Sequence, residues 1–305
     1  MAALSDVLTA SRAPARLGRF VLRMFRPQIY VTYGVLWTLT LEGSAEALSG
    51  PSSHWTPSGA TVVRAVSVVL ALLFARMVDE QKDLEYDRRH NPDRPLVTGA
   101  ITVAELRGAM ALITVVVVVL NALVSALSVL LILLALGYTL FLVALERWSP
   151  RIGEALIANL LVSYPVQLLL SGYLYVSLLT GDAIDGDGRA VPLMAMFACA
   201  FLQFEFARKT EWRRDPEARL YSEVLGPRGG AAVCLALAVG AVALELLLFG
   251  TRGLLPALSV VFPALGAWRF LVRRRPSGLM LPAMGFVLFF NLLCFYGSTA
   301  IAIGR

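Results

Sequence analysis

Charged residues are scarce in this chain. Asp, Glu, Lys and Arg make up 16% of its 305 residues, while 58% are hydrophobic. Soluble domains contain about 25% charged residues, so an ordinary soluble domain is excluded. The stretch Ala111–Leu145 holds no charge, and several other runs are nearly as apolar. Runs of that kind are long enough to cross a bilayer as helices, and they lack the alternation that membrane-spanning strands require.

Cysteine and processing signals are also scarce. The chain has three cysteines, Cys199, Cys234 and Cys294, all inside apolar runs, where they are expected to be small buried hydrophobic residues. No small-residue cleavage site follows the first apolar run, so we expect a retained cytoplasmic tail and not a signal peptide. Internal repeats are absent, and we expect a single transmembrane domain over residues 1–305.

Apolar length and breaker residues predict about nine membrane-spanning helices. The expected ranges are 28–48, 60–78, 101–120, 123–145, 152–179, 190–207, 229–250, 253–272 and 280–303. The long apolar run after residue 110 is divided at Asn121 and Ser125, because it is too long for one span.

Basic residues fall on one side of this arrangement. With a cytoplasmic N-terminus, all of the 27 Lys and Arg lie in or beside the tail and the even-numbered loops, except Arg64, Arg189, Arg252 and Arg305. This bias predicts an integral membrane protein whose tail and charged loops are cytoplasmic, and we expect the plasma membrane of a bacterium. The net charge of +6 then indicates attraction to the lipid bilayer and not nucleic-acid binding.

The second loop, residues 76–99, concentrates acidic side chains. Asp79, Asp83 and Asp87 recur every four positions, and Glu80 follows the first of them. On one helix they would form a stripe of mutually repelling charges. Neighbouring Arg could compensate them in a solvated cluster. The alternative is Mg²⁺, which binds one or two carboxylates together with phosphate oxygens.

The sixth loop begins with a second charged group. Glu205, Arg208 and Lys209 lie at helical spacings, and the simplest interpretation is an intrahelical Glu205–Lys209 pair. The sequence contains two Lys, Lys82 and Lys209, and each falls in one of the two charged loops. Because an ammonium ion is a compact ligand for phosphate, phosphate binding is the second interpretation.

The fifth expected helix carries a polar stripe inside an apolar segment. Its members recur every four residues: Asn159, Ser163, Gln167 and Ser171. Such residues face a cavity or the bundle interior, and hydrogen bonding between helices is the alternative role. Pro165 predicts a kink within this stripe.

Taken together, these motifs resemble those of the UbiA superfamily of intramembrane prenyltransferases. DEQKDLEYD (79–87) is similar to the family's NDxxDxxxD, and RPLVTG (94–99) to the RPLxSG-like segment after it. Arg26-Pro27 resembles the opening of the family's first helix, and YSEVLG (221–226) the segment that closes its second motif. The resemblance covers nearly the whole chain, but Glu205-Phe-Ala-Arg208-Lys209 replaces the family's DxxxD.

The resemblance implies an all-α, polytopic membrane bundle around a central cavity, with Mg²⁺ and an isoprenyl diphosphate held under a cytoplasmic cap. The implied metal ligands are Asp79, Glu80, Asp83, Asp87 and Glu205. The expected catalytic residues are Asp83, Asp87, Arg208 and Lys209, the last two binding diphosphate directly. Expected substrate-binding residues are Arg88, Arg94, Arg147, Asn159, Ser163, Tyr164 and Gln167. Candidates to stabilise an allylic cation are Tyr30, Tyr33, Tyr164, Tyr173 and Tyr296.

Three functions stay open on the sequence. Transfer of the prenyl group to a small hydrophobic acceptor, with aromatic rings among the candidates, is the superfamily's usual activity. Cyclisation without an acceptor, by a UbiA-type terpene cyclase, is favoured by the altered second motif. A non-enzymatic transporter or scaffold would explain the helices but not the paired charged loops.

Overall fold

A computed structural model describes residues 13–49, 56–149, 155–181, 183–212, 220–274 and 278–303. Every regular element in these ranges is a helix, which confirms the predicted all-α class. Several basic residues counted above lie outside the described residues: Arg12, Arg151, Arg213, Arg214, Arg219, Arg275 and Arg305.

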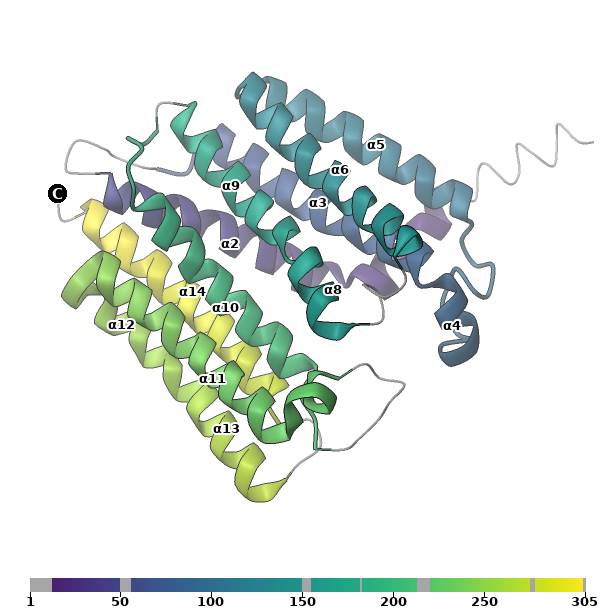
Figure 1. Cartoon of the computed structure of the whole chain (residues 1–305). Helices are drawn as coiled ribbons and strands as arrows, with labels where there is room; N and C mark the ends of the chain where they lie inside the picture. Colours follow the sequence, from purple (N-terminus) through teal and green to yellow (C-terminus); the bar gives the residue numbers. More distant parts are fainter. Residues whose placement is uncertain are drawn as a thin grey trace, which may run out of the picture.

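The long helices run side by side along one direction (Figure 1). The first half of the chain contains η1 (Val21–Phe25), α2 (Pro27–Leu48), α3 (Gly59–Lys82), α4 (Leu84–His90), α5 (Val103–Ala122) and α6 (Ala126–Trp148). The second half contains α8 (Leu156–Ser163), α9 (Pro165–Leu179), α10 (Ala190–Arg208), α11 (Tyr221–Phe249), η3 (Gly250–Gly253), α12 (Leu254–Ala257), η4 (Leu258–Val260), α13 (Val261–Arg273) and α14 (Met280–Ile303).

Helix α2 joins the two sides of the bundle. It packs against α3 and α9 on one side and against α14 on the other, while α10 packs against α11 (Figure 1). Within the described residues, seven helices are long and apolar enough to cross a membrane. One of them, Tyr221–Arg273, includes both α11 and α13, and α2 is not among the seven. The membrane character is therefore confirmed, and the count of nine stays a prediction.

Local sequence signals explain where several helices begin. The Ser125 hydroxyl accepts a hydrogen bond from the backbone N–H of Ser128 and so starts α6. This cap confirms that the long apolar run divides where predicted. Thr102 and Glu105 form a capping box at the start of α5. Gly226 has a φ of 70°, which favours glycine, and it kinks α11 just before Pro227.

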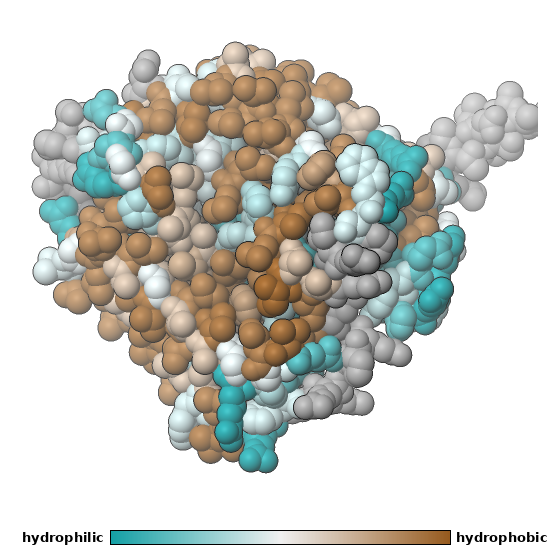
Figure 2. All heavy atoms as spheres, viewed as in Figure 1, coloured by the Kyte–Doolittle hydropathy of each residue, from teal (hydrophilic) through white to brown (hydrophobic). Residues whose placement is uncertain are grey.

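The outer surface is apolar in a wide band. Figure 2 shows hydrophobic residues over most of one face, with hydrophilic residues gathered mainly near its edges. Exposed apolar side chains on α5 and α6 include Leu112, Val115, Val119, Leu130, Leu134 and Phe141. A surface of this kind is stable in contact with lipid chains.

One exception to the charge bias has a structural explanation. Arg64, at 2% exposure, is buried and pairs with Glu42 at 2.5 Å. The other Glu42 oxygen accepts a hydrogen bond from the Thr61 hydroxyl at 2.8 Å. Arg64 is thus part of an internal ion pair between α2 and α3 and not a charge of an outer loop.

Candidate functional site

The first acidic motif lies at the end of the bundle where α3 meets α4 (Figure 1). Helix α3 continues four residues beyond the expected end at residue 78, so Asp79 and Glu80 belong to the helix itself. It ends at Lys82, and Asp83 leaves the helical conformation before α4 begins. The expected single stripe of Asp79, Asp83 and Asp87 is therefore wrong, because the backbone breaks at Asp83.

Two carboxylates of this motif are held by other side chains. Glu80, which is buried, accepts hydrogen bonds from Arg76 and from Arg94, the latter at 2.5 Å. Asp87 is also buried, and its Oδ1 accepts a hydrogen bond from Asn91 at 2.7 Å and lies 3.8 Å from Arg94 Nε. RPLVTG thus supplies the cation, Arg94, that fixes the motif in place.

The other two carboxylates, Asp79 and Asp83, are exposed to solvent. The Asp79 carboxylate lies in the electrostatic field of Arg76, Lys82 and Asp83. Because they are exposed to solvent, we call Asp79 and Asp83 the open half of the motif, and we call the buried Glu80 and Asp87 its anchored half.

Lys82 connects this motif to α6 and α8. Its Nζ lies 3.2 Å from Oε1 of Glu146, on the last turn of α6. The same oxygen accepts a hydrogen bond from Asn159 Nδ2 at 3.0 Å. Our sequence reasoning missed this link, although Glu146 is the first charge after the uncharged stretch Ala111–Leu145.

The second motif is a compact ion cluster at the end of α10. Glu205 Oε2 lies 2.7 Å from Arg208, and Glu205 Oε1 lies 2.8 Å from Lys209. The Lys209 ammonium also lies 5.2 Å from the centre of the Tyr221 ring. The backbone N–H of Tyr221 donates to the Lys209 carbonyl at 2.8 Å, so YSEVLG packs onto this motif.

Aromatic rings connect α2 with α10. The Tyr33 and Trp37 rings each lie 5.0 Å from the Phe201 ring, measured between centroids. Tyr30 stacks on Phe25 at 4.7 Å, and Arg208 lies within electrostatic range of Tyr30. Trp37 and Phe201 were missed in the sequence because each falls inside an apolar run.

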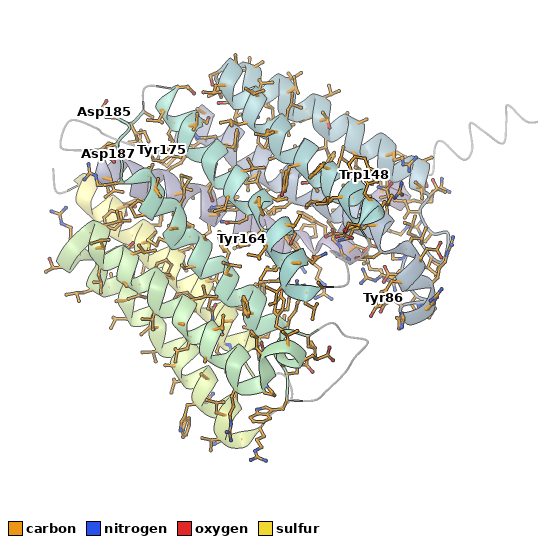
Figure 3. The ribbon with its side chains drawn as sticks, in the orientation of Figure 1. Tyr86, Trp148, Tyr164, Tyr175, Asp185 and Asp187 are labelled. Carbon is orange, nitrogen blue, oxygen red and sulfur yellow. The ribbon has the colours of Figure 1, made fainter. Side chains whose placement is uncertain are left out.

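The other tyrosine candidates have separate roles. Tyr164 lies at the kink, near α10 (Figure 3), and its hydroxyl donates to the Ala198 carbonyl at 2.7 Å. Tyr173 is fully buried and donates to Asn121 at 2.7 Å, which makes it a packing residue. Tyr296 is 62% exposed on α14 and does not belong to the aromatic cluster.

The polar stripe is divided by the predicted kink, since α8 ends at Ser163 and α9 begins at Pro165. Asn159 bonds to Glu146, and the Ser163 hydroxyl donates to the Leu160 carbonyl at 3.3 Å. Gln167 donates to Ser171, but its Oε1 is buried with no partner in the part of the chain that is described. Gln167 is thus the member of the stripe with unused hydrogen-bonding capacity.

Two expected substrate-binding residues, Arg88 and Arg147, lie on the exposed surface near the first motif. Arg88 pairs with Glu85 at 2.5 Å, and both side chains are largely exposed. Arg147 is exposed on the last turn of α6.

Oxygen ligands suited to a hard cation are present, although no group of three candidate ligands is close enough to hold a metal ion among the described residues. Asp79 and Asp83 offer exposed carboxylates, and Oε2 of Glu80 is buried without a partner in the described structure. This donor set fits Mg²⁺, which takes few carboxylates and completes its shell with phosphate oxygens and water. Glu205 fits less well, because Arg208 and Lys209 already neutralise it.

A family model described as the UbiA prenyltransferase family matches residues 35–293. No match was found among curated proteins. The apo structure of a UbiA homologue from Aeropyrum pernix K1 has a TM-score of 0.63 and 19% identity, covering 87% of this chain and 97% of that chain.

A UbiA homologue from Archaeoglobus fulgidus bound to DMAPP and Mg²⁺ has a TM-score of 0.60 and 15% identity, covering 93% of this chain and 99% of that chain. The structure of a UbiA homologue from the same organism bound to GPP and Mg²⁺ has a TM-score of 0.58 and 16% identity over the same shares. At these identities the similarity shows a shared fold.

Proposed function

The chain belongs to the UbiA prenyltransferase family, and on this premise we propose that it ionises an isoprenyl diphosphate and transfers the prenyl group to a small hydrophobic acceptor. The observation that supports this most is the division of the first motif into an anchored half and an open half. Glu80 and Asp87 are buried and contact Arg94, while the carboxylates of Asp79 and Asp83 are exposed to solvent.

Mg²⁺ is the cation proposed for the open half, with Asp79 and Asp83 as its protein ligands. Solved structures of Archaeoglobus fulgidus homologues are described as bound to DMAPP or GPP with Mg²⁺. When bound, the ion would neutralise charge on the leaving diphosphate. Asp87, proposed from the sequence as a ligand, acts in this account by orienting Arg94.

The chain's own cations supply further stabilisation. Arg208 and Lys209 lie at the end of α10, at the same end of the bundle as the first motif (Figure 1), and their two positive charges exceed the single negative charge of Glu205 by one. We propose that they turn toward the diphosphate as its negative charge grows during cleavage of the carbon–oxygen bond. Arg94 adds a third positive charge beside the first motif.

Tyr33 is half-buried and packs against the buried rings of Trp37 and Phe201, and we propose that its ring contacts the hydrocarbon part of the donor. An aromatic face can stabilise an allylic cation through cation–π attraction, and the apolar helices around it exclude water. The prenyl carbon then bonds to the acceptor, which loses a proton. Diphosphate leaves with the electron pair of the broken carbon–oxygen bond.

A second candidate is cyclisation of the prenyl chain without an acceptor. The ion cluster of Glu205, Arg208 and Lys209 favours it, because the second motif offers no uncompensated carboxylate for a second metal or a proton. Product analysis distinguishes the two. Purified protein with Mg²⁺ and prenyl diphosphates of several lengths should form a prenylated product that requires an acceptor. Cyclic hydrocarbons formed without any acceptor would establish the second candidate instead.

A further inference from the structure

The Lys82 ammonium lies among carboxylates of two different helices. It follows Asp79 by three residues on α3 and adjoins Asp83, and both carboxylates act on it electrostatically together with Glu146. Residues three apart on a helix are neighbours on its surface. The ammonium is therefore shared between the open half of the first motif and a carboxylate of α6.

Glu146 holds this ammonium toward the α6 side of the site. Its Oε1 lies 3.2 Å from Lys82 Nζ and accepts a second hydrogen bond from Asn159 at 3.0 Å, which fixes the carboxylate in place. Both side chains of the Lys82–Glu146 pair are about three-quarters covered, at 25% and 23% exposure. Partial burial strengthens the attraction compared with that of a pair in water.

We propose that Lys82 is an internal counter-ion that competes with a divalent cation for Asp79 and Asp83, and that Glu146 is the positioning residue that draws its ammonium aside. This inference rests on the proposed function, which places the metal at those two carboxylates. Without the charge of Glu146, the carboxylates that still attract the ammonium are those of Asp79 and Asp83, and a metal ion would have to displace it.

This arrangement has a consequence for the order of binding. With Lys82 nearby, the two carboxylates attract a free metal ion weakly. A diphosphate supplies oxygen ligands to the metal and a new partner to the ammonium. Metal and donor therefore bind together more favourably than metal alone.

Binding of Mn²⁺ to the purified full-length chain, followed by electron paramagnetic resonance without substrate, tests the proposal. Lys82→Met should tighten Mn²⁺ binding by about tenfold, because it removes a positive charge that acts on both Asp79 and Asp83. Glu146→Gln should weaken it by a similar factor. In the Lys82→Met/Glu146→Gln double variant the affinity should stay near that of Lys82→Met, because Glu146 acts through Lys82.

Glu105→Gln is the matched control for Glu146→Gln. Glu105 also pairs with a cation near this end of the bundle, Arg16, at 2.5 Å, and glutamine can keep its capping box. The Glu105→Gln variant should bind Mn²⁺ with an affinity near that of the wild type. If Lys82→Met does not yield monodisperse protein, Lys82→Gln keeps a donor for Glu146 and carries the same expectation.

Two results would overturn the inference alone: unchanged Mn²⁺ affinity after removal of the Lys82 charge, or equal weakening by Glu146→Gln with and without Lys82. The first result would show that the pair only joins α3 to α6, and the second that Glu146 acts on the metal site independently of Lys82. Binding that is insensitive to Asp79→Asn and Asp83→Asn would instead remove the proposed metal site itself, and this inference with it.

Discussion

Arg94 Nη1 donates a hydrogen bond to Glu80 Oε1 at 2.5 Å, joining two residues that are fourteen positions apart. Through this contact the RPLVTG segment folds back onto the end of α3. The same guanidinium reaches Asp87 at 3.8 Å, so one side chain organises both buried carboxylates of the motif.

Arg94→Ala should therefore reduce both stability and turnover. It removes charge-assisted hydrogen bonds to buried Glu80, which costs roughly 2 kcal/mol of unfolding free energy, although Arg76 remains as a partner. Thermal unfolding in detergent measures the change. Arg88→Ala breaks an exposed pair and should shift the midpoint little. Equal shifts for the two variants would show that Arg94 does not anchor the motif.

The second motif gives a prediction that separates ion pairing from phosphate binding. If Lys209 and Arg208 bind diphosphate, Glu205→Gln frees both cations and should tighten binding of inorganic pyrophosphate, while Lys209→Ala should weaken it by about tenfold. Isothermal titration calorimetry measures both affinities. Glu85→Gln, which frees the exposed Arg88, is the matched control. Wild-type pyrophosphate affinity in both Glu205→Gln and Lys209→Ala would reduce the cluster to a helix-surface pair.

Gln167 is expected to influence which donor is used. Its Oε1 is buried and unpartnered in the described structure, just after the kink at Pro165. Gln167→Phe should shift preference toward shorter prenyl diphosphates, because added volume shortens the space for the tail. Competition between donors of different length measures this preference. The control is Leu168→Phe, which changes the neighbouring residue, whose side chain is 40% exposed. Leu168→Phe should leave the donor-length preference unchanged. Loss of expression with an unaltered product profile would make Gln167 a packing residue.

Membrane orientation can be checked with single cysteines in a background without Cys199, Cys234 and Cys294. His90→Cys on α4 should be protected from an impermeant thiol reagent in intact cells, because the basic residues place that end in the cytoplasm. Asp187→Cys, in the loop between α9 and α10 at the opposite end of the bundle (Figure 3), should react. Labelling of His90→Cys together with protection of Asp187→Cys would show the opposite membrane orientation.

Much of the fold could be predicted from the sequence, because apolar length and breaker residues act locally. The break at Asn121–Ser125 follows from the Ser125 side chain, which caps the start of α6. The kink at Pro165 follows from proline's lack of a backbone N–H. The site was harder to predict. The contacts of Asp87 with Asn91 and Arg94 could not be predicted, because they depend on how the segments after α3 fold back on one another.

The contact between Lys82 and Glu146 also could not be predicted from the sequence. The two residues are 64 positions apart, and the relation becomes visible once α3 and α6 are packed. The aromatic contact of Trp37 with Phe201 likewise joins separate helices. Each of these rings lies in an apolar run where periodicity alone does not separate a lining residue from a packing residue.

Release of pyrophosphate from a prenyl diphosphate by the purified protein in liposomes tests the central claim most directly. We predict release that requires Mg²⁺, stops in EDTA, and falls by at least about a hundredfold in Asp79→Asn and Asp83→Asn, because each removes a ligand charge from the open half of the motif. Wild-type release in EDTA, or full activity in both variants, would contradict ionisation at the first motif.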